Sequence, residues 1–210
     1  MSRRASARLL SWVFGEGDEK MVRLYRLNPG YGPDGNSPWD WAQGVPPYSA
    51  ERDSTIARPG RKANDWRPFT VRIIREQRTG DHFHFAGGHP VWNDRAWSVL
   101  EPIIGESAEV LTVKVEGGGE LWLLNVLDFV PLGTSTEGSY NKVAKAMTSV
   151  RRYAFHEEDV ENKVIFRAQG MGFGDCIVSE LFKQAAESAG LLGMGFNELD
   201  WIRETRRTNG

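Results

Sequence analysis

The sequence CIVSELFKQAAESAGLLGMGFNELDW (residues 176–201) contains, in order, the signals for a strand, a helix and a second extended segment. Ser179 is a favourable N-cap, because a serine hydroxyl accepts a hydrogen bond from a main-chain amide of the first helical turn. Apolar residues then recur at helical spacing, at Leu181, Phe182, Ala185, Ala186 and Ala189. Gly190 follows where a left-handed residue commonly ends a helix. These signals predict a capped amphipathic helix and a strand through Met194 and Phe196.

Residues 91–115 follow the same plan. Asn93 is a second N-cap candidate, Gly105 lies at the expected helix end, and an apolar strand follows at 109–115. The two caps are 86 residues apart. We interpret the pair as a duplicated strand-helix-strand unit, although any two amphipathic helices followed by strands would look alike. We expect Pro102 to kink or break the first helix, because a proline inside a helix costs about 3 kcal/mol.

Other apolar patterns predict further strands, at 21–27, 68–76, 82–86, 121–130, 150–155 and 164–166. Turns at 79–81 and 116–120 are expected to join neighbouring strands as hairpins. The Gly-, Pro- and Asn-rich residues 28–49, and the polar residues 131–142, are predicted to be loops. The fold class is therefore α+β, with an antiparallel-rich sheet and two capped amphipathic helices.

The signature VSELFKQAAESAGLLGMGFNEL (residues 178–199) resembles the closing segment of the Imm-eleven immunity-protein family of bacterial polymorphic toxin systems. The order of elements upstream fits as well: the capped helix near Asn93, the strand that begins at Leu121, and the strand that begins at Val164. The resemblance covers roughly residues 81–200. It implies a non-catalytic protein that binds a cognate toxin domain, encoded by an adjacent gene, and occludes its active site.

The division of the chain follows this resemblance. Residues 81–210 are expected to form the immunity-like α+β domain. Residues 1–80 are expected to supply an N-terminal strand and long loops, either as part of the same domain or as an extension.

Charge is distributed unevenly along the chain. Residues 1–80 carry 14 basic and 9 acidic side chains, whereas residues 81–200 carry 9 basic and 18 acidic side chains, a net charge of −9. An acidic surface attracts a basic partner such as a nuclease toxin, although ordinary solvated charge is the commoner explanation. The basic segment 51–78 lacks a recognised nucleic-acid motif, so we expect no nucleic-acid partner.

Two groups of residues are candidates for contact with the toxin. Trp39, Asp40 and Trp41 lie in the predicted loop 28–49, where aromatic side chains are good interface anchors. Glu157, Glu158 and Asp159 form an acidic turn or short helix. The oligomeric state stays open.

The alternative function is a metal-dependent enzyme or ligand-binding protein that uses His82, His84 and His89, with Cys176 as a further candidate. His82 and His84 share one face of the predicted strand, which suits imidazole ligation. The opposing interpretation is that these histidines face solvent while the phenylalanines between them face the core. No neighbouring motif supplies the remaining ligands, so we expect neither metal nor cofactor.

No run of 18 apolar residues occurs, the single cysteine excludes an internal disulfide, and the N-terminal apolar run is short for a signal peptide. We therefore expect a cytoplasmic protein with no membrane span.

Asn125 and Asp128 are the only polar residues of the apolar segment 121–130, and they are candidates for either catalysis or main-chain hydrogen bonding.

Overall fold

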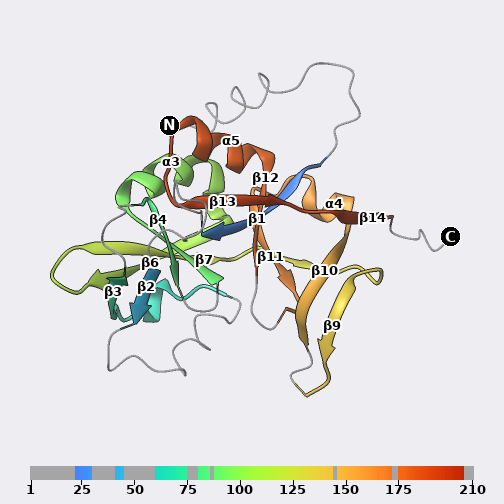
Figure 1. The fold of residues 1–210 in the computed structure, drawn as a ribbon, viewed down its shortest axis with the longest axis horizontal. Helices are drawn as coiled ribbons and strands as arrows, with labels where there is room; N and C mark the ends of the chain where they lie inside the picture. The colour runs from blue at the N-terminus through green and yellow to red at the C-terminus, as the bar shows by residue number, and fades with distance from the viewer. Residues whose placement is uncertain are drawn as a thin grey trace.

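A closed barrel, a five-stranded sheet and a three-stranded sheet form the fold of the described residues (Figure 1). The computed structural model describes residues 22–29, 41–44, 60–74, 80–85, 88–143, 146–171 and 175–205. The barrel has the order β2-β3-β6-β7-β5-β4 and comprises β2 (Trp41–Gly44), β3 (Thr70–Ile74), β4 (His82–Phe85), β5 (His89–Trp92), β6 (Ala108–Val115) and β7 (Glu120–Val126).

The five-stranded sheet has the order β13-β1-β12-β11-β8 and comprises β1 (Leu24–Pro29), β8 (Phe129–Pro131), β11 (Ile165–Gln169), β12 (Cys176–Ser179) and β13 (Met194–Glu198). The three-stranded sheet has the order β14-β10-β9 and comprises β9 (Glu137–Asn141), β10 (Ala146–His156) and β14 (Trp201–Glu204). The helices are α3 (Asp94–Ile104), α4 (Glu157–Val160) and α5 (Glu180–Ser188), with short 3-10 turns η1 (Ala63–Asp65) and η3 (Gly105–Ser107). Most strand pairs are antiparallel, which confirms the predicted antiparallel-rich α+β class.

Both long helices begin at the predicted caps. The Asn93 side chain accepts a hydrogen bond from the amide of Ala96, and the Ser179 hydroxyl accepts one from the amide of Phe182. Gly190 follows α5 with a φ of 61°, a left-handed conformation that favours glycine. The cap, helix and glycine terminator predicted for residues 176–201 are therefore confirmed.

Replacing Ser179 with alanine tests the contribution of this cap. We expect the free energy of unfolding to fall by about 1 kcal/mol, because the first-turn amide loses its acceptor. Urea denaturation followed by circular dichroism measures the change. Ser188→Ala, at the exposed end of the same helix, is the matched control and is expected to change stability by less than about 0.5 kcal/mol. An equal loss in both variants would contradict the capping role.

The two strand-helix-strand units share one topology. In the first, β5 and β6 flank α3 in sequence and are both antiparallel to β7, which lies between them. In the second, β12 and β13 flank α5 and are both antiparallel to β1. Each unit therefore contains two parallel strands separated by one antiparallel strand from elsewhere in the chain. The two units whose helix caps lie 86 residues apart in the sequence therefore have the same strand arrangement.

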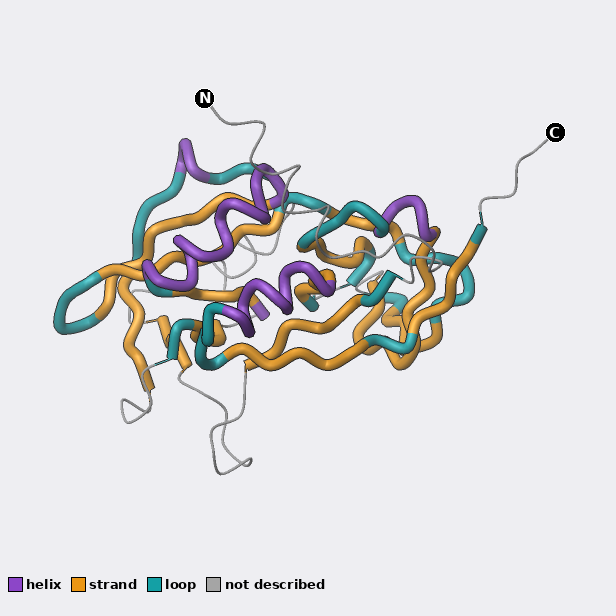
Figure 2. The backbone as a smooth tube through the Cα atoms, turned by 90° about the horizontal axis from the view of Figure 1, so that it is seen from above, coloured by secondary structure: helices purple, strands orange, loops and turns teal. Residues whose placement is uncertain are grey.

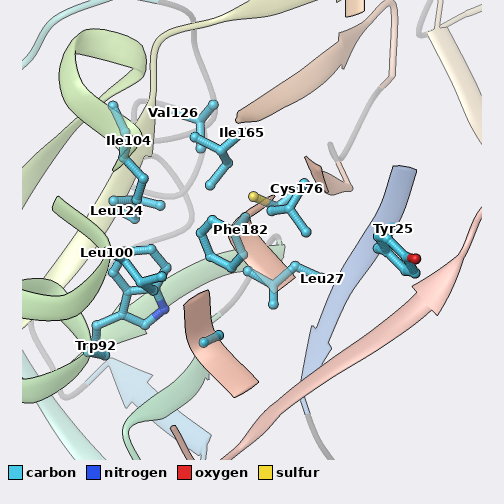
Figure 3. Packing of buried hydrophobic residues seen from close by; sticks show 14 residues of the cluster. Tyr25, Leu27, Trp92, Leu100, Ile104, Leu124, Val126, Ile165, Cys176 and Phe182 are labelled. Carbon is cyan, nitrogen blue, oxygen red and sulfur yellow. The ribbon is translucent and has the colours of Figure 1, made fainter. Parts of the chain in front are cut away.

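Helices α3 and α5 pack on the same side of the sheets, as Figure 2 shows from a second direction. Their apolar faces meet strands of the barrel and of the five-stranded sheet in a core around Trp92, Leu100 and Phe182, each 0% exposed (Figure 3). A second core fills the barrel, and a third lies between the five-stranded and three-stranded sheets. Among the described residues, no helix combines the length and the apolar character needed to cross a membrane.

The described parts of residues 1–80 pair directly with strands of residues 81–210. Strand β1 lies between β12 and β13, and strands β2 and β3 complete the barrel. Leu24 and Val71 are both 0% exposed. These N-terminal strands therefore contribute to the same hydrophobic cores as the rest of the chain.

The predicted hairpin between residues 68–76 and 82–86 is wrong. Strand β2 lies between β3 and β4 in the barrel, antiparallel to β3 and parallel to β4. It was missed because four residues inside a Gly- and Pro-rich segment give no periodic signal. The hydrogen bonds that close the barrel decide its conformation.

Two further predictions require correction. Residues 131–142 contain β9, whose side chains are largely exposed and whose extended form depends on pairing with β10. The predicted strand 121–130 is divided into β7 and β8. The amides of Leu127 and Asp128 both donate to the carbonyl of Ser107, at 2.8 and 3.3 Å, as the chain leaves the barrel for the five-stranded sheet.

Helix α3 continues through Pro102 to Ile104, so the expected break is absent. Proline removes the hydrogen bond to the carbonyl four residues earlier, which is that of Ser98. Both residues are exposed, so the Ser98 carbonyl is accessible to solvent and the loss of its donor costs little. The buried face formed by Ala96, Leu100 and Ile104 stays intact.

Candidate partner-binding surface

The three-stranded sheet carries one of the two predicted contact groups. Strand β10 runs for 11 residues and leads directly into α4, which presents Glu157, Glu158 and Asp159. Acidic residues favour the first turn of a helix, where they face the positive end of the helix dipole. Val160 is 1% exposed and anchors this short helix in the core between the two sheets. The acidic turn is therefore held in a fixed position on the sheet.

The three acidic residues differ in their surroundings. Glu157 forms an ion pair with Arg203 of β14, with Oε1 and Nη1 3.1 Å apart. Glu158 is exposed, whereas Asp159 is half-buried. Of the three side chains, Glu158 is therefore the one most accessible to a partner.

A second carboxylate fixes the position of β14. Glu204 accepts a hydrogen bond from the amide of Ser135 at 2.7 Å and lies 3.9 Å from the imidazole of His156. The hydrogen bonds from Ser135 hold the pKa of Glu204 below its usual range. Gly133 leaves room for this carboxylate, since a Cβ there would lie 2.6 Å from it. The loop before β9 is thus tied to the C-terminal strand.

Strand β9 forms the outer edge of the three-stranded sheet and carries exposed apolar groups near its end. Tyr140 is 57% exposed, and Val143 in the turn that follows is 94% exposed. The hairpin of β9 and β10 projects at the lower right of Figure 1. A sheet edge with an exposed tyrosine offers main-chain hydrogen bonds and an aromatic anchor to a partner. Sequence reasoning missed Tyr140, because its environment follows from the undetected strand.

Only one residue of the other predicted contact group lies within the described part of the chain. Trp39 and Asp40 fall outside the described residues, and only the backbone of Trp41 is described. Trp41 begins β2 and pairs with Ile74 and His84 in the barrel. Figure 1 places β2 and α4 at opposite sides of the molecule, so the structure does not bring Trp41 and the acidic turn together.

His82 and His89 are not arranged as the alternative function requires. His82 and His89 are each 2% exposed, so neither faces solvent as the opposing interpretation expected. His82 pairs with Trp92 and His89 with Phe85, at opposite ends of the β4–β5 hairpin. Paired residues share a face and neighbours alternate, so the two histidines lie on opposite faces. His82 Nδ1 accepts a hydrogen bond of 2.9 Å from the indole of Trp92.

The remaining residues of the alternative function add no metal centre to the part of the chain that the structure describes. The side chain of His84 lies outside that part. Cys176 is 1% exposed, and burial raises the pKa of its thiol to about 12, so the unreactive neutral form prevails at neutral pH. No group of three or more His, Cys, Asp or Glu side chains suited to a metal ion occurs among the described side chains.

One end of the barrel contains a polar cluster of three residues. On β7, Asn125 continues the barrel-facing positions of Leu121 and Leu123 and is 2% exposed. Glu109 is its direct partner on β6. Lys62, just before η1, lies against both and donates to the Asn125 side chain. The two polar residues of segment 121–130 therefore have different partners, since Asp128 accepts a hydrogen bond from Ser107.

Comparison with known proteins adds no assignment. The sequence matches no protein-family model and no curated protein.

Proposed function

We propose that this protein is an immunity protein that binds a cognate bacterial toxin domain in the cytoplasm and neutralises it by occlusion, without catalysis. The observation that carries the proposal is the segment 178–199. Its Ser-capped helix, glycine terminator and phenylalanine-containing strand follow the order of the closing signature that the Imm-eleven family has. The net charge of −9 on residues 81–200 adds support, because it suits a basic toxin.

The surface that serves this function best is the three-stranded sheet with α4. It combines an accessible acidic side chain, Glu158, with the exposed ring of Tyr140 at a sheet edge. Tyr140 lies beside the start of β10, and Glu158 lies just past the end of β10. About ten residues of this strand therefore separate the two side chains, which corresponds to roughly 30 Å at the usual rise per residue. An interface of standard size, about 800 Å² per partner, spans a comparable distance. One toxin domain can therefore contact both ends of this sheet.

Co-expression with the product of the adjacent gene in a sensitive bacterial host tests the function. We expect the neighbour alone to arrest growth, this protein to restore growth, and the two to co-purify as a 1:1 complex. A neighbour that is harmless, or one that kills equally with and without this protein, would remove the proposal's support.

Replacing Tyr140 with alanine tests the binding surface. We expect the affinity for the toxin to fall by about 2 kcal/mol, or roughly thirtyfold in Kd, because an aromatic anchor is lost. Stability should change by less than about 0.5 kcal/mol, because the ring is 57% exposed. Isothermal titration calorimetry of the co-purified pair measures Kd. Tyr140→Phe retains the ring and is expected to bind nearly as the natural protein does.

A charge-reversal pair tests the acidic turn in the same assay. Glu158→Lys places a positive charge on α4, whereas Glu101→Lys makes the same change at an exposed position of α3. Weakening by the first variant alone locates the toxin at the three-stranded sheet. Equal effects of the two variants would mean that only overall charge matters, and the proposed surface would be wrong.

A further inference from the structure

The polar cluster at the end of the barrel contains the groups for a covalent reaction. Lys62 Nζ donates to Asn125 Oδ1 at 3.0 Å and to the carbonyl of Gly60 at 2.9 Å. Asn125 Nδ2 donates to Glu109 Oε1 at 2.7 Å. The amide of Lys62 donates to the same Glu109 oxygen at 2.5 Å. The Asn125 carboxamide therefore contacts both the Lys62 amine and the Glu109 carboxylate.

We propose that Lys62 and Asn125 form an intramolecular isopeptide bond, with Glu109 transferring the proton. The Nζ lone pair attacks Cγ of Asn125, and a carbon–nitrogen bond forms. Glu109 takes a proton from Nζ and delivers it to Nδ2 of Asn125. The Cγ–Nδ2 bond then breaks, ammonia leaves, and a secondary amide remains. An amine and a carboxamide thus become an amide and ammonia, and the reaction requires neither an oxidant nor a co-reactant.

The geometry brings the reacting groups together. The hydrogen bond of 3.0 Å from Lys62 Nζ to Asn125 Oδ1 holds the amine beside the carboxamide that it attacks, so the two groups need no diffusional encounter. Glu109 lies within hydrogen-bonding distance of the leaving nitrogen, as a general acid–base group must. Asn125 is 2% exposed, so bulk water has little access to the amide carbon.

The surroundings also favour the reactive, neutral form of the amine. Burial lowers the pKa of Lys62, and the positive charge of the nearby Arg167 lowers it further, although Glu109 opposes both effects. Arg167 is 4% exposed on β11, beside this end of the barrel. A larger fraction of Lys62 is therefore neutral than for a solvated lysine.

The bond would join the segment before η1 to strand β7 of the barrel. These two parts of the chain are 63 positions apart in the sequence. A cross-link over such a span restricts the unfolded chain, as a disulfide does. This proposal does not depend on the proposed immunity function.

Intact-mass spectrometry of the purified full-length protein tests the bond. We expect a mass lower than that of the sequence by one ammonia, and a proteolytic digest in which the peptides containing Lys62 and Asn125 stay joined. Trypsin should fail to cleave after Lys62. A protein of full sequence mass, with trypsin cleavage after Lys62, would overturn the proposal.

Variants distinguish the cross-link from other losses of ammonia. Lys62→Arg, which retains the charge, and Glu109→Gln are each expected to keep the full mass of their own sequences. Lys163→Arg is the matched control, because Lys163 pairs with Asp128 outside the cluster, and it should still lose ammonia. A succinimide at an asparagine also releases ammonia, but it would persist in Lys62→Arg and would contradict the cross-link. If a variant fails to fold, the mass and peptide map of the natural protein still decide the question.

Discussion

Replacing Trp92 with alanine is expected to lower the free energy of unfolding by about 3–5 kcal/mol, the largest loss from any single side chain discussed. The Trp92 side chain is 0% exposed and lies in the core shared by α3, α5, the barrel and the five-stranded sheet. Its ring stacks on Trp97, with centroids 6.4 Å apart, and contacts Phe182 at 6.1 Å. Its indole N–H donates to His82. The substitution removes these contacts and leaves a cavity where the elements meet.

Chemical denaturation followed by circular dichroism measures this effect. Trp92→Phe keeps most of the apolar volume but loses the hydrogen bond to His82, so a loss of only about 1–2 kcal/mol is expected. Trp122→Ala is the matched control on the neighbouring strand. The Trp122 ring is half-buried, and its indole hydrogen bond to Asp94 is exposed, so we expect a loss of about 1 kcal/mol. A cost for Trp92→Ala as small as that of the control would contradict a shared core.

Replacing Asp81 with alanine is expected to cost about 3 kcal/mol, because three hydrogen-bond donors lose a buried charged acceptor. Asp81 is 5% exposed, and its carboxylate accepts three hydrogen bonds. The donors are the amide of Leu192 and the side chains of Asn93 and Arg95. These donors belong to the α5–β13 connection, the cap of α3 and the first turn of α3. One carboxylate thus fastens the ends of both long helices to the start of β4.

The Arg95 guanidinium adds a second connection at this junction. It also donates to the carbonyls of Ala189 and Gly190 at the C-terminus of α5, where the helix dipole favours a cation. A double-mutant cycle of Asp81→Ala and Arg95→Ala, measured by denaturation, separates the ion pair from the other hydrogen bonds. We expect a coupling energy of about 1 kcal/mol, because Arg95 is half-exposed. A coupling near zero, together with an unchanged stability of Asp81→Ala, would show that the junction contributes little.

The helices were predictable because their signals are local. The caps at Asn93 and Ser179, the apolar spacing and the glycine at 190 all act within one or two helical turns. The hairpin between β6 and β7 is local for the same reason, since three glycines with positive φ form its turn. Strands β2 and β9 were not predictable, because their extended form depends on hydrogen bonds to strands distant in sequence. The break expected at Pro102 does not occur, because the cost of a proline within a helix depends on whether the carbonyl that loses its donor is exposed.

The candidate surface was predictable only in part. The acidic turn Glu157–Asp159 was found from its composition, and the structure places it on a one-turn helix. Its ion pair with Arg203 could not be foreseen, because β14 reaches β10 only through the tertiary fold. Tyr140 becomes a candidate only once β9 is known to be a sheet edge. The cluster of Lys62, Glu109 and Asn125 has no sequence signal beyond one polar residue in an apolar strand.

By itself, the sequence determined the α+β class, the two capped helices and the uneven charge, because composition, periodicity and caps act over a few neighbouring residues. The tertiary structure alone decided which strands pair, that the barrel closes, and that β1 lies between β12 and β13. It also decided that His82 and His89 are buried on opposite faces and that Lys62 reaches Asn125. These outcomes depend on long-range hydrogen bonds and on burial against distant segments, whose free energies no local pattern records.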